Sequence, residues 1–232
     1  MKQLTIFAFS LLAFFACDLK TVTDAIGSSD QLSEGEVARG LKEALTKGIS
    51  KGAAELATEN GYLESPYKIL LPEEAQNIVK KLKVIPGFSD FEQEMITRIN
   101  RAAEDAATEA KPIFVSAIQK MTIQDAWNIL RGEENAATSY LQRTTYDDLY
   151  AAFQPKIETS LNKVNAVDYW ESAINKYNSL PFVKKMNPRL DDYVTNEALN
   201  GLFAKIAEEE ANIRKNPVAR TTELLKKVFG RK

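Results

Sequence analysis

The chain has 232 residues, with 30 Lys and Arg, 32 Asp and Glu, one Cys and no His. Without His, the chain cannot form a Ser-His-Asp triad, a His-ligated zinc site or a His-ligated haem site. One Cys excludes an internal disulfide and a Cys-rich metal site, and a net charge of −2 predicts no nucleic-acid partner. The 10 Gly and 8 Pro together make up a smaller share of the chain than the average of roughly 12%. Because Gly and Pro are typical of turns, their shortage favours helices.

The first 16 residues have the pattern of a secretory signal peptide. Lys2 precedes an apolar run from Leu4 to Ala16 that only two hydroxyl residues interrupt. As a helix this run would span about 20 Å, which is shorter than the roughly 30 Å hydrocarbon core of a bilayer. A short charged region followed by 7–15 apolar residues describes a secretory signal. We therefore expect residues 1–16 to be removed from the mature protein.

The single Cys lies directly after this run. Phe14-Phe15-Ala16-Cys17 resembles a bacterial lipobox, in which the Cys becomes the lipidated N-terminal residue, although Phe14 stands where Leu is usual. The alternative is an incidental Cys in an uncleaved segment. Several acyl chains would anchor the protein stably, because each buried CH₂ contributes about 0.8 kcal/mol. We predict a lipid anchor on Cys17, with residues 17–32 forming the lipidated end and a polar tether.

From residue 33 onward the sequence predicts helices and no strand. Ser33 and Glu36 form a capping box at the start of the first helix. In this helix Gly48 and Gly52, four residues apart, indicate either a close helix crossing or simple tolerance of glycine. Helices are expected over 33–58, over 72–83, over 90–110 with a continuation over 113–121, and from a cap at Thr122 to about 132. Further helices are expected over 133–143, from a cap at Thr144 or Thr145 to 164, and over 168–180, 191–214 and 223–229. We expect one all-α domain over 33–232, an irregular bundle of eight or nine helices.

Proline and alanine mark special positions in this pattern. A kink or a break is expected near Lys111, because Pro112 lacks a backbone donor, and Pro155 is expected to bend its helix. The helix over 90–110 carries a strip of small side chains that another helix can approach closely: Ala102, Ala103, Ala106, Ala107 and Ala110. The helix carrying Leu199 and Ile213 is the expected cover for this strip.

One candidate polar site lies on an apolar stripe. Ile206, Glu210 and Ile213 have helical spacing, and Glu209 is a near-equivalent position. A buried carboxylate needs a partner, so we predict that one of the two acids is buried and pairs with an arginine from another segment. The candidate arginines are Arg98, Arg101 and Arg220. Both a polar site and a structural salt bridge fit this pattern, and we favour the salt bridge.

The remaining acidic pairs predict no catalytic, cofactor-binding or metal-binding residue. Most of them lie at expected helix starts, where a negative charge complements the helix dipole. A helical di-iron site needs Glu-x-x-His, and neither a calcium loop nor a Gly-rich phosphate loop is present in the sequence. Aromatic residues such as Trp127 and Trp170 fall at helical spacing, which favours core positions over a ligand cage.

Four segments are similar to a known family. They are NRAAE at 100–104 with EAKPIF at 109–114, MTIQDA at 121–126, LPF at 180–182, and a long C-terminal motif from DYVT at 192–195 to ARTT at 219–222. The chain resembles the bacterial domain-of-unknown-function family 4197 over nearly all of residues 33–230. The family is usually found behind a signal or lipoprotein leader, which agrees with Cys17. The resemblance implies an envelope location and a helical fold, and it implies no activity.

These observations favour a non-catalytic binding or interaction module, anchored to an envelope membrane and facing the periplasm, with an envelope protein as its partner. The alternative is a carrier of an apolar small molecule or lipid between helices, and a carboxylate-based hydrolase is less favoured. An enclosed pocket above about 300 Å³ would support the carrier. A filled core with an exposed apolar patch would support the interaction module.

Overall fold

The computed structural model describes residues 33–73, 75–76, 90–163, 166–179, 181–182, 185, 187, 189–216, 218, 222, 226 and 228. The signal peptide, Cys17 and the tether lie outside the described residues, as do Arg220 and most of the expected helices over 72–83 and 223–229.

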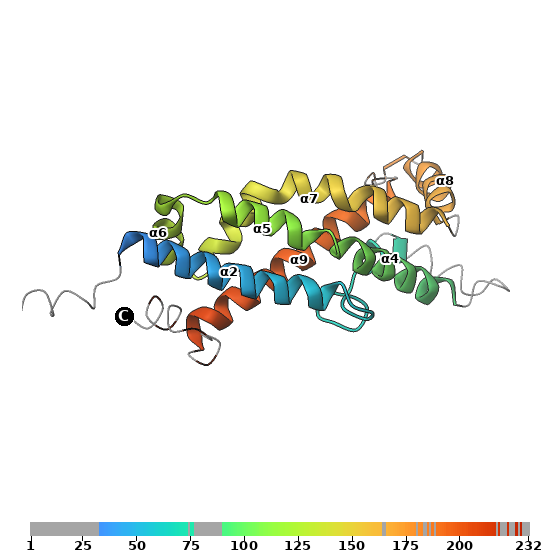
Figure 1. Ribbon diagram of the computed structural model, residues 1–232. Coiled ribbons are helices and arrows are strands. Elements are labelled where there is room, and N and C mark those ends of the chain that lie inside the picture. The colour runs from blue at the N-terminus through green and yellow to red at the C-terminus, as the bar shows by residue number, and fades with distance from the viewer. Residues whose placement is uncertain are drawn as a thin grey trace, which may run out of the picture.

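The described residues form helices joined by turns and loops, with no strand among them (Figure 1). The helices are α2 (Glu34–Leu56), α4 (Phe91–Ala107), α5 (Ala110–Lys120), α6 (Ile123–Arg131), α7 (Ala136–Asn162), α8 (Ala166–Asn178) and α9 (Leu190–Lys215). The predicted all-α class is therefore confirmed. The described helices are fewer than the eight or nine predicted, so that number is not matched. None of them is long and apolar enough to cross a membrane.

One reason for the smaller number is that α7 is continuous where the sequence predicts two helices. Thr144 and Thr145, the expected caps, lie inside α7. Their hydroxyls donate to the carbonyl oxygens of Tyr140 at 2.9 Å and Leu141 at 2.6 Å. Such bonds to the preceding turn let threonine remain within a helix, so the predicted cap is wrong. Pro155 also lies within α7.

Two other predicted helix starts are confirmed, and near Lys111, where a kink or a break was expected, the structure shows a break. Ser33 and Glu36 form a reciprocal capping box at α2, and Thr122 forms another at α6 with its partner three residues on. Helix α4 ends at Ala107 and α5 begins at Ala110, just before Pro112. Proline is tolerated there because the first turn of a helix has no internal partner for its backbone N–H groups.

The first and last of the described helices cross closely. A Cβ atom at Gly48 would lie 3.0 Å from Ile213 Cδ1, and one at Gly52 would lie 3.3 Å from Lys205 Cγ. The absence of side chains at these two positions lets α2 approach α9. Of the two interpretations of this glycine pair, the structure therefore shows the close crossing.

The alanine strip of α4 and α5 is fully covered. Its five residues are at most 1% exposed: Ala102, Ala103, Ala106, Ala107 and Ala110. Helix α4 packs more extensively against α7 than against α9. The expectation that the Leu199–Ile213 helix is the main cover is therefore corrected, because α9 lies chiefly against α2 and α7.

Candidate binding groove

Glu209 lies at the crossing of α2 and α9 and is 5% exposed. Lys51 of α2 donates to its two carboxylate oxygens at 2.8 and 3.0 Å, and Lys205 Nζ lies 3.3 Å from Oε1. Lys205 also contacts Glu55 at 2.9 Å and Glu208 at 3.1 Å. Burial alone would lower the pKa of Lys205, but its carboxylate partners outweigh burial and raise the pKa. In this cluster each lysine therefore lies beside a carboxylate, and the buried Glu209 lies beside two lysines.

Glu210 is equally buried but serves a different partner, the first turn of α7. It accepts hydrogen bonds from the backbone N–H groups of Ala137 at 3.0 Å and Thr138 at 2.9 Å, and from the Thr138 hydroxyl at 2.8 Å. Arg214 Nε donates to the same carboxylate at 2.9 Å. Asn135, the N-cap of α7, makes no side-chain cap bond. Glu210 therefore satisfies N–H groups that a helix start leaves without an internal partner.

The structure brings neither Arg98 nor Arg101 to these two acids. Arg98 pairs with Glu94, one turn earlier on α4. Arg101 Nη1 lies 2.6 Å from Glu104, and Arg101 Nη2 lies 3.1 Å from Glu59. Arg220 lies outside the described residues.

The expected pairing is therefore corrected for Arg98 and Arg101, while the prediction for Arg220 is not tested. For Glu209 a lysine, Lys51, supplies the charge from another helix, and for Glu210 the arginine is Arg214 on the same helix. Residues four apart on a helix face one another, which allows Arg214 to reach Glu210 without a second segment. Protein groups thus surround both carboxylates, as a structural salt bridge requires.

Sequence reasoning missed a third buried acid, Glu104, which is 4% exposed. Its Oε1 accepts hydrogen bonds from the backbone N–H groups of Tyr62 and Leu63, both at 3.1 Å. The missed signal was a carboxylate within the alanine strip, three residues after Arg101. Glu104 fixes the loop after α2 against α4.

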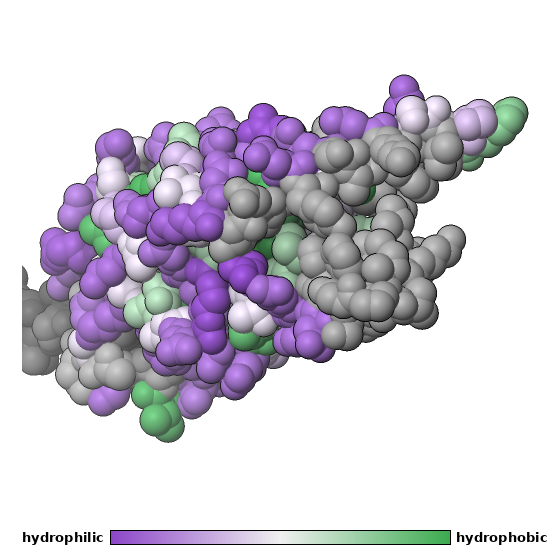
Figure 2. All heavy atoms as spheres, turned by 90° about the vertical axis from the view of Figure 1, so that its right-hand side faces the viewer, coloured by the Kyte–Doolittle hydropathy of each residue, from purple (hydrophilic) through white to green (hydrophobic). Residues whose placement is uncertain are grey.

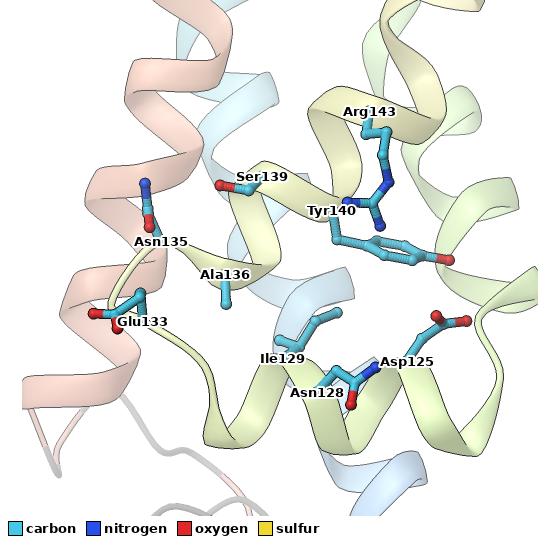
Figure 3. Close-up of a pocket in the computed structure, with 9 residues that line it drawn as sticks. All are labelled: Asp125, Asn128, Ile129, Glu133, Asn135, Ala136, Ser139, Tyr140 and Arg143. Atoms are coloured by element: carbon cyan, nitrogen blue, oxygen red, sulfur yellow. The ribbon is translucent and has the colours of Figure 1, made fainter.

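Two neighbouring hollows share Tyr140. The first hollow, of about 390 Å³, lies between α6 and the start of α7 (Figure 3). The Tyr140 ring projects from α7 between Arg143 and Asp125 (Figure 3), and the guanidinium carbon of Arg143 lies 5.7 Å from the ring centroid. Burial raises the pKa of the Tyr140 phenol, Asp125 adds to this shift, and Arg143 opposes it.

The second hollow, of about 570 Å³, lies between α5 and α7. Its apolar lining includes Ile113 and Ala117 beside Tyr140, and its charged residues are Lys120 and Asp148. We call the two hollows together the Tyr140 groove. Both are open to solvent, whereas a third hollow, between α2, α7 and α9, measures only about 10 Å³, which is room for one water molecule at most.

The structure thus defines an all-helical bundle with a packed apolar core and an open amphipathic groove. A family model described as "Protein of unknown function (DUF4197)" matches residues 31–230. The chain belongs to this family, which confirms the resemblance seen in the sequence. Comparison with curated proteins and with solved structures gives no match.

Proposed function

We propose that the protein is a non-catalytic binding module of the bacterial envelope. In this proposal a lipid on Cys17 holds the protein at a membrane, the helical domain faces the periplasm, and the Tyr140 groove binds a segment of an envelope protein. The observation that carries the proposal is the groove itself, in which apolar and charged side chains meet at one aromatic ring. Tyrosine and arginine are enriched among the residues that dominate binding at protein interfaces.

The shape of the hollows supports a polypeptide partner over a small apolar ligand. Sites for small molecules bury some 70–90% of the ligand surface, whereas the hollows of about 390 and 570 Å³ are both open to solvent. Among the described residues, the exposed large hydrophobic side chains are Leu70, Ile123, Phe182 and Val218. Figure 2 likewise shows hydrophilic side chains over most of the described surface at the α4 and α8 end.

The chemistry of Asp125 supports a binding role over a catalytic one. Its Oδ2 accepts hydrogen bonds from the Thr122 hydroxyl at 2.7 Å and the Thr122 N–H at 2.9 Å. These bonds lower the pKa of Asp125 and occupy its Oδ2 atom. This groove carboxylate is therefore engaged in capping α6.

The lipid anchor is tested with Cys17→Ser. Because lipid transfer requires the thiol, we expect this variant to lose acyl labelling and to leave the membrane fraction. Acyl label and membrane partitioning that persist in the Ser variant would show that the lipobox interpretation is wrong.

The groove is tested by photo-crosslinking in cells. A photo-reactive amino acid at Ser116 or Ser139, which line the two hollows, should capture the same envelope protein. The same amino acid at Ala204, an exposed position of α9 outside the groove, is the control. With the captured protein purified, Tyr140→Ala should weaken binding about 30-fold, the size of a typical hot-spot effect. Unchanged binding would contradict the proposal.

A further inference from the structure

The walls of the Tyr140 groove leave apolar surface open to solvent along two neighbouring helices. Ile113 and Ala117 of α5 pack against the apolar core, but both are only half-buried where they line the second hollow. Tyr140 of α7 is half-buried in the same way and continues this surface into the first hollow. The groove can therefore accept a further apolar element laid along α5 and α7.

Helices α5 and α7 run in opposite directions, which sets the order of side chains along the groove (Figure 1). Lys156 of α7 lies 2.6 Å from Glu109, just before α5, whereas α6, which follows α5, lies beside the start of α7. Lys120, at the end of α5, therefore lies at the Tyr140 end of the second hollow, and Asp148 lies toward its other end.

The charged side chains alternate in sign along the groove. In order along it they are Asp125 and Glu133, then Arg143 and Lys120, and then Asp148. Neither Arg143 nor Lys120 forms an ion pair with another described residue, and the Arg143 guanidinium lies beside the Tyr140 ring (Figure 3). These two cations are therefore available to an acidic group of a bound segment.

The walls of the groove offer few hydrogen bonds to the backbone of a bound segment. Within α5 and α7 the backbone groups bond along their own helices. An extended segment that lost water here would leave its own N–H and C=O groups without partners, whereas a helix satisfies them internally. At the Asp148 end, Pro155 has no N–H group for the carbonyl oxygen of Ala151, so this oxygen can accept from a basic side chain.

We propose that the groove binds an amphipathic helix of the envelope partner, an inference that rests on the function proposed above. The apolar face of this helix lies on the half-buried apolar side chains of both walls. An acidic side chain faces Arg143 and Lys120, and a basic side chain faces Asp148. Because Arg143 and Asp148 are five residues apart, they lie about 7.5 Å apart along α7, so the acid and the base of the bound helix are about one turn apart.

The length of the groove sets the length of the bound helix. Helix α7 lines the two hollows from Ala136 to Ala151, which is about 22 Å, or about 15 residues of a helix. Helices that bind in grooves place apolar anchors at every third or fourth residue. The expected segment therefore has about four turns, one apolar face and an acidic residue near its middle.

Crosslink mapping in cells tests the helical form of the occupant. The photo-reactive amino acid is placed at Ser116, Ser139, Thr144 and Ala151 in separate variants, and mass spectrometry identifies the residues that each one captures. We expect captured residues in one segment of the partner, three or four positions apart, as on one face of a helix. Captured residues two positions apart would indicate an extended segment, and capture of a second copy of this chain would indicate self-association. Either result would overturn this inference, whereas absence of any captured protein would contradict the proposed function itself.

Charge exchange tests the acidic contact. The probe is a synthetic peptide with the sequence of the captured segment, and fluorescence anisotropy measures its affinity. Arg143→Gln should weaken binding about tenfold, because it removes a charged hydrogen-bond donor. Arg39→Gln removes the same charge at an exposed position of α2 outside the groove and should change binding less than about twofold.

Arg143→Glu should weaken binding further, and a peptide in which Lys replaces the facing acidic residue should restore it. Equal weakening by Arg143→Gln and Arg39→Gln, or no recovery with the exchanged peptide, would overturn the assigned contact. Capture of the partner in cells would persist in either case, so these results leave the proposed function standing.

Discussion

Two consecutive helices, α4 and α5, pack against α7, and only α4 packs without leaving a groove. Ala103 and Ala106 of α4 are fully buried, whereas Ile113 and Ala117 of α5 are half-buried beside a hollow of about 570 Å³. Small side chains occur on both helices, so residue size alone does not decide which contact closes. The break between α4 and α5 lets the two helices take different paths, and α5 also packs against α2. The candidate binding surface therefore lies between α5 and α7, just after the break that ends the close contact of α4 with α7.

The largest effect is expected from Glu210, because it supports the start of the helix that both contacts share. Glu210→Ala leaves Arg214, whose side chain is only 15% exposed, without its carboxylate and removes the partners of two N–H groups of α7. Breaking a buried pair costs about 3–5 kcal/mol. Chemical denaturation measures this loss. Glu73→Ala, at an exposed position, is the control, and equal small losses from both changes would contradict a structural role for Glu210.

A matched pair of alanine substitutions tests the comparison directly. Ala106→Leu adds three carbons to the close contact, where overpacking typically costs about 1–3 kcal/mol. Ala117→Leu adds the same atoms beside the groove and should cost much less, because there is open space and Leu is a good helix former. Thermal unfolding of both variants measures the difference. If the two midpoints fall equally, then α5 is packed as closely as α4 and the groove is not a stable feature.

The smallest effect concerns acid stability at the crossing of α2 and α9. A hydrogen bond from Lys205 is the main cause that lowers the pKa of Glu55, and bonds from Tyr67 and Lys205 lower the pKa of Glu208. Their contribution to the free energy of unfolding is therefore present above about pH 4.5, and it is lost as the pH falls through the lowered values. In the double variant Glu55→Gln with Glu208→Gln, the free energy of unfolding, measured by denaturation at a series of pH values, should fall less steeply below about pH 4.5. A free energy of unfolding that falls as steeply as in the wild type would show that these two carboxylates do not contribute this stability.

The sequence predicted the parts of the fold that depend on local chemistry. The capping boxes at Ser33 and Thr122 and the break before Pro112 each involve residues within one turn of one another. The cap expected at Thr144 or Thr145 was wrong because a threonine hydroxyl can form its hydrogen bond either at a helix start or to the preceding turn of a longer helix. Only the packing of α7 against its neighbours decides between these two outcomes.

The site was less predictable because its partners are distant in the sequence. The burial of Glu209 and Glu210 follows from helical spacing, but the N–H groups that Glu210 accepts from are backbone atoms 72 and 73 residues away. Because every residue except proline has a backbone N–H group, the sequence does not indicate which of them bonds to Glu210. Tyr140 carries no local signal either, since its place in a groove depends on the directions of α5, α6 and α7.

The crossing of α2 with α9 also constrains the order in which the protein can fold. Lys51 and Glu209, which meet there, are 158 residues apart in the chain. Helices α5 and α6 also pack against α2, but a growing chain cannot complete the cover of α2 until α9, near its end, has been synthesised. Contacts between such distant residues slow folding. For a protein exported as proposed here, that delay would keep the chain unfolded during passage through the membrane and let the bundle close on the far side.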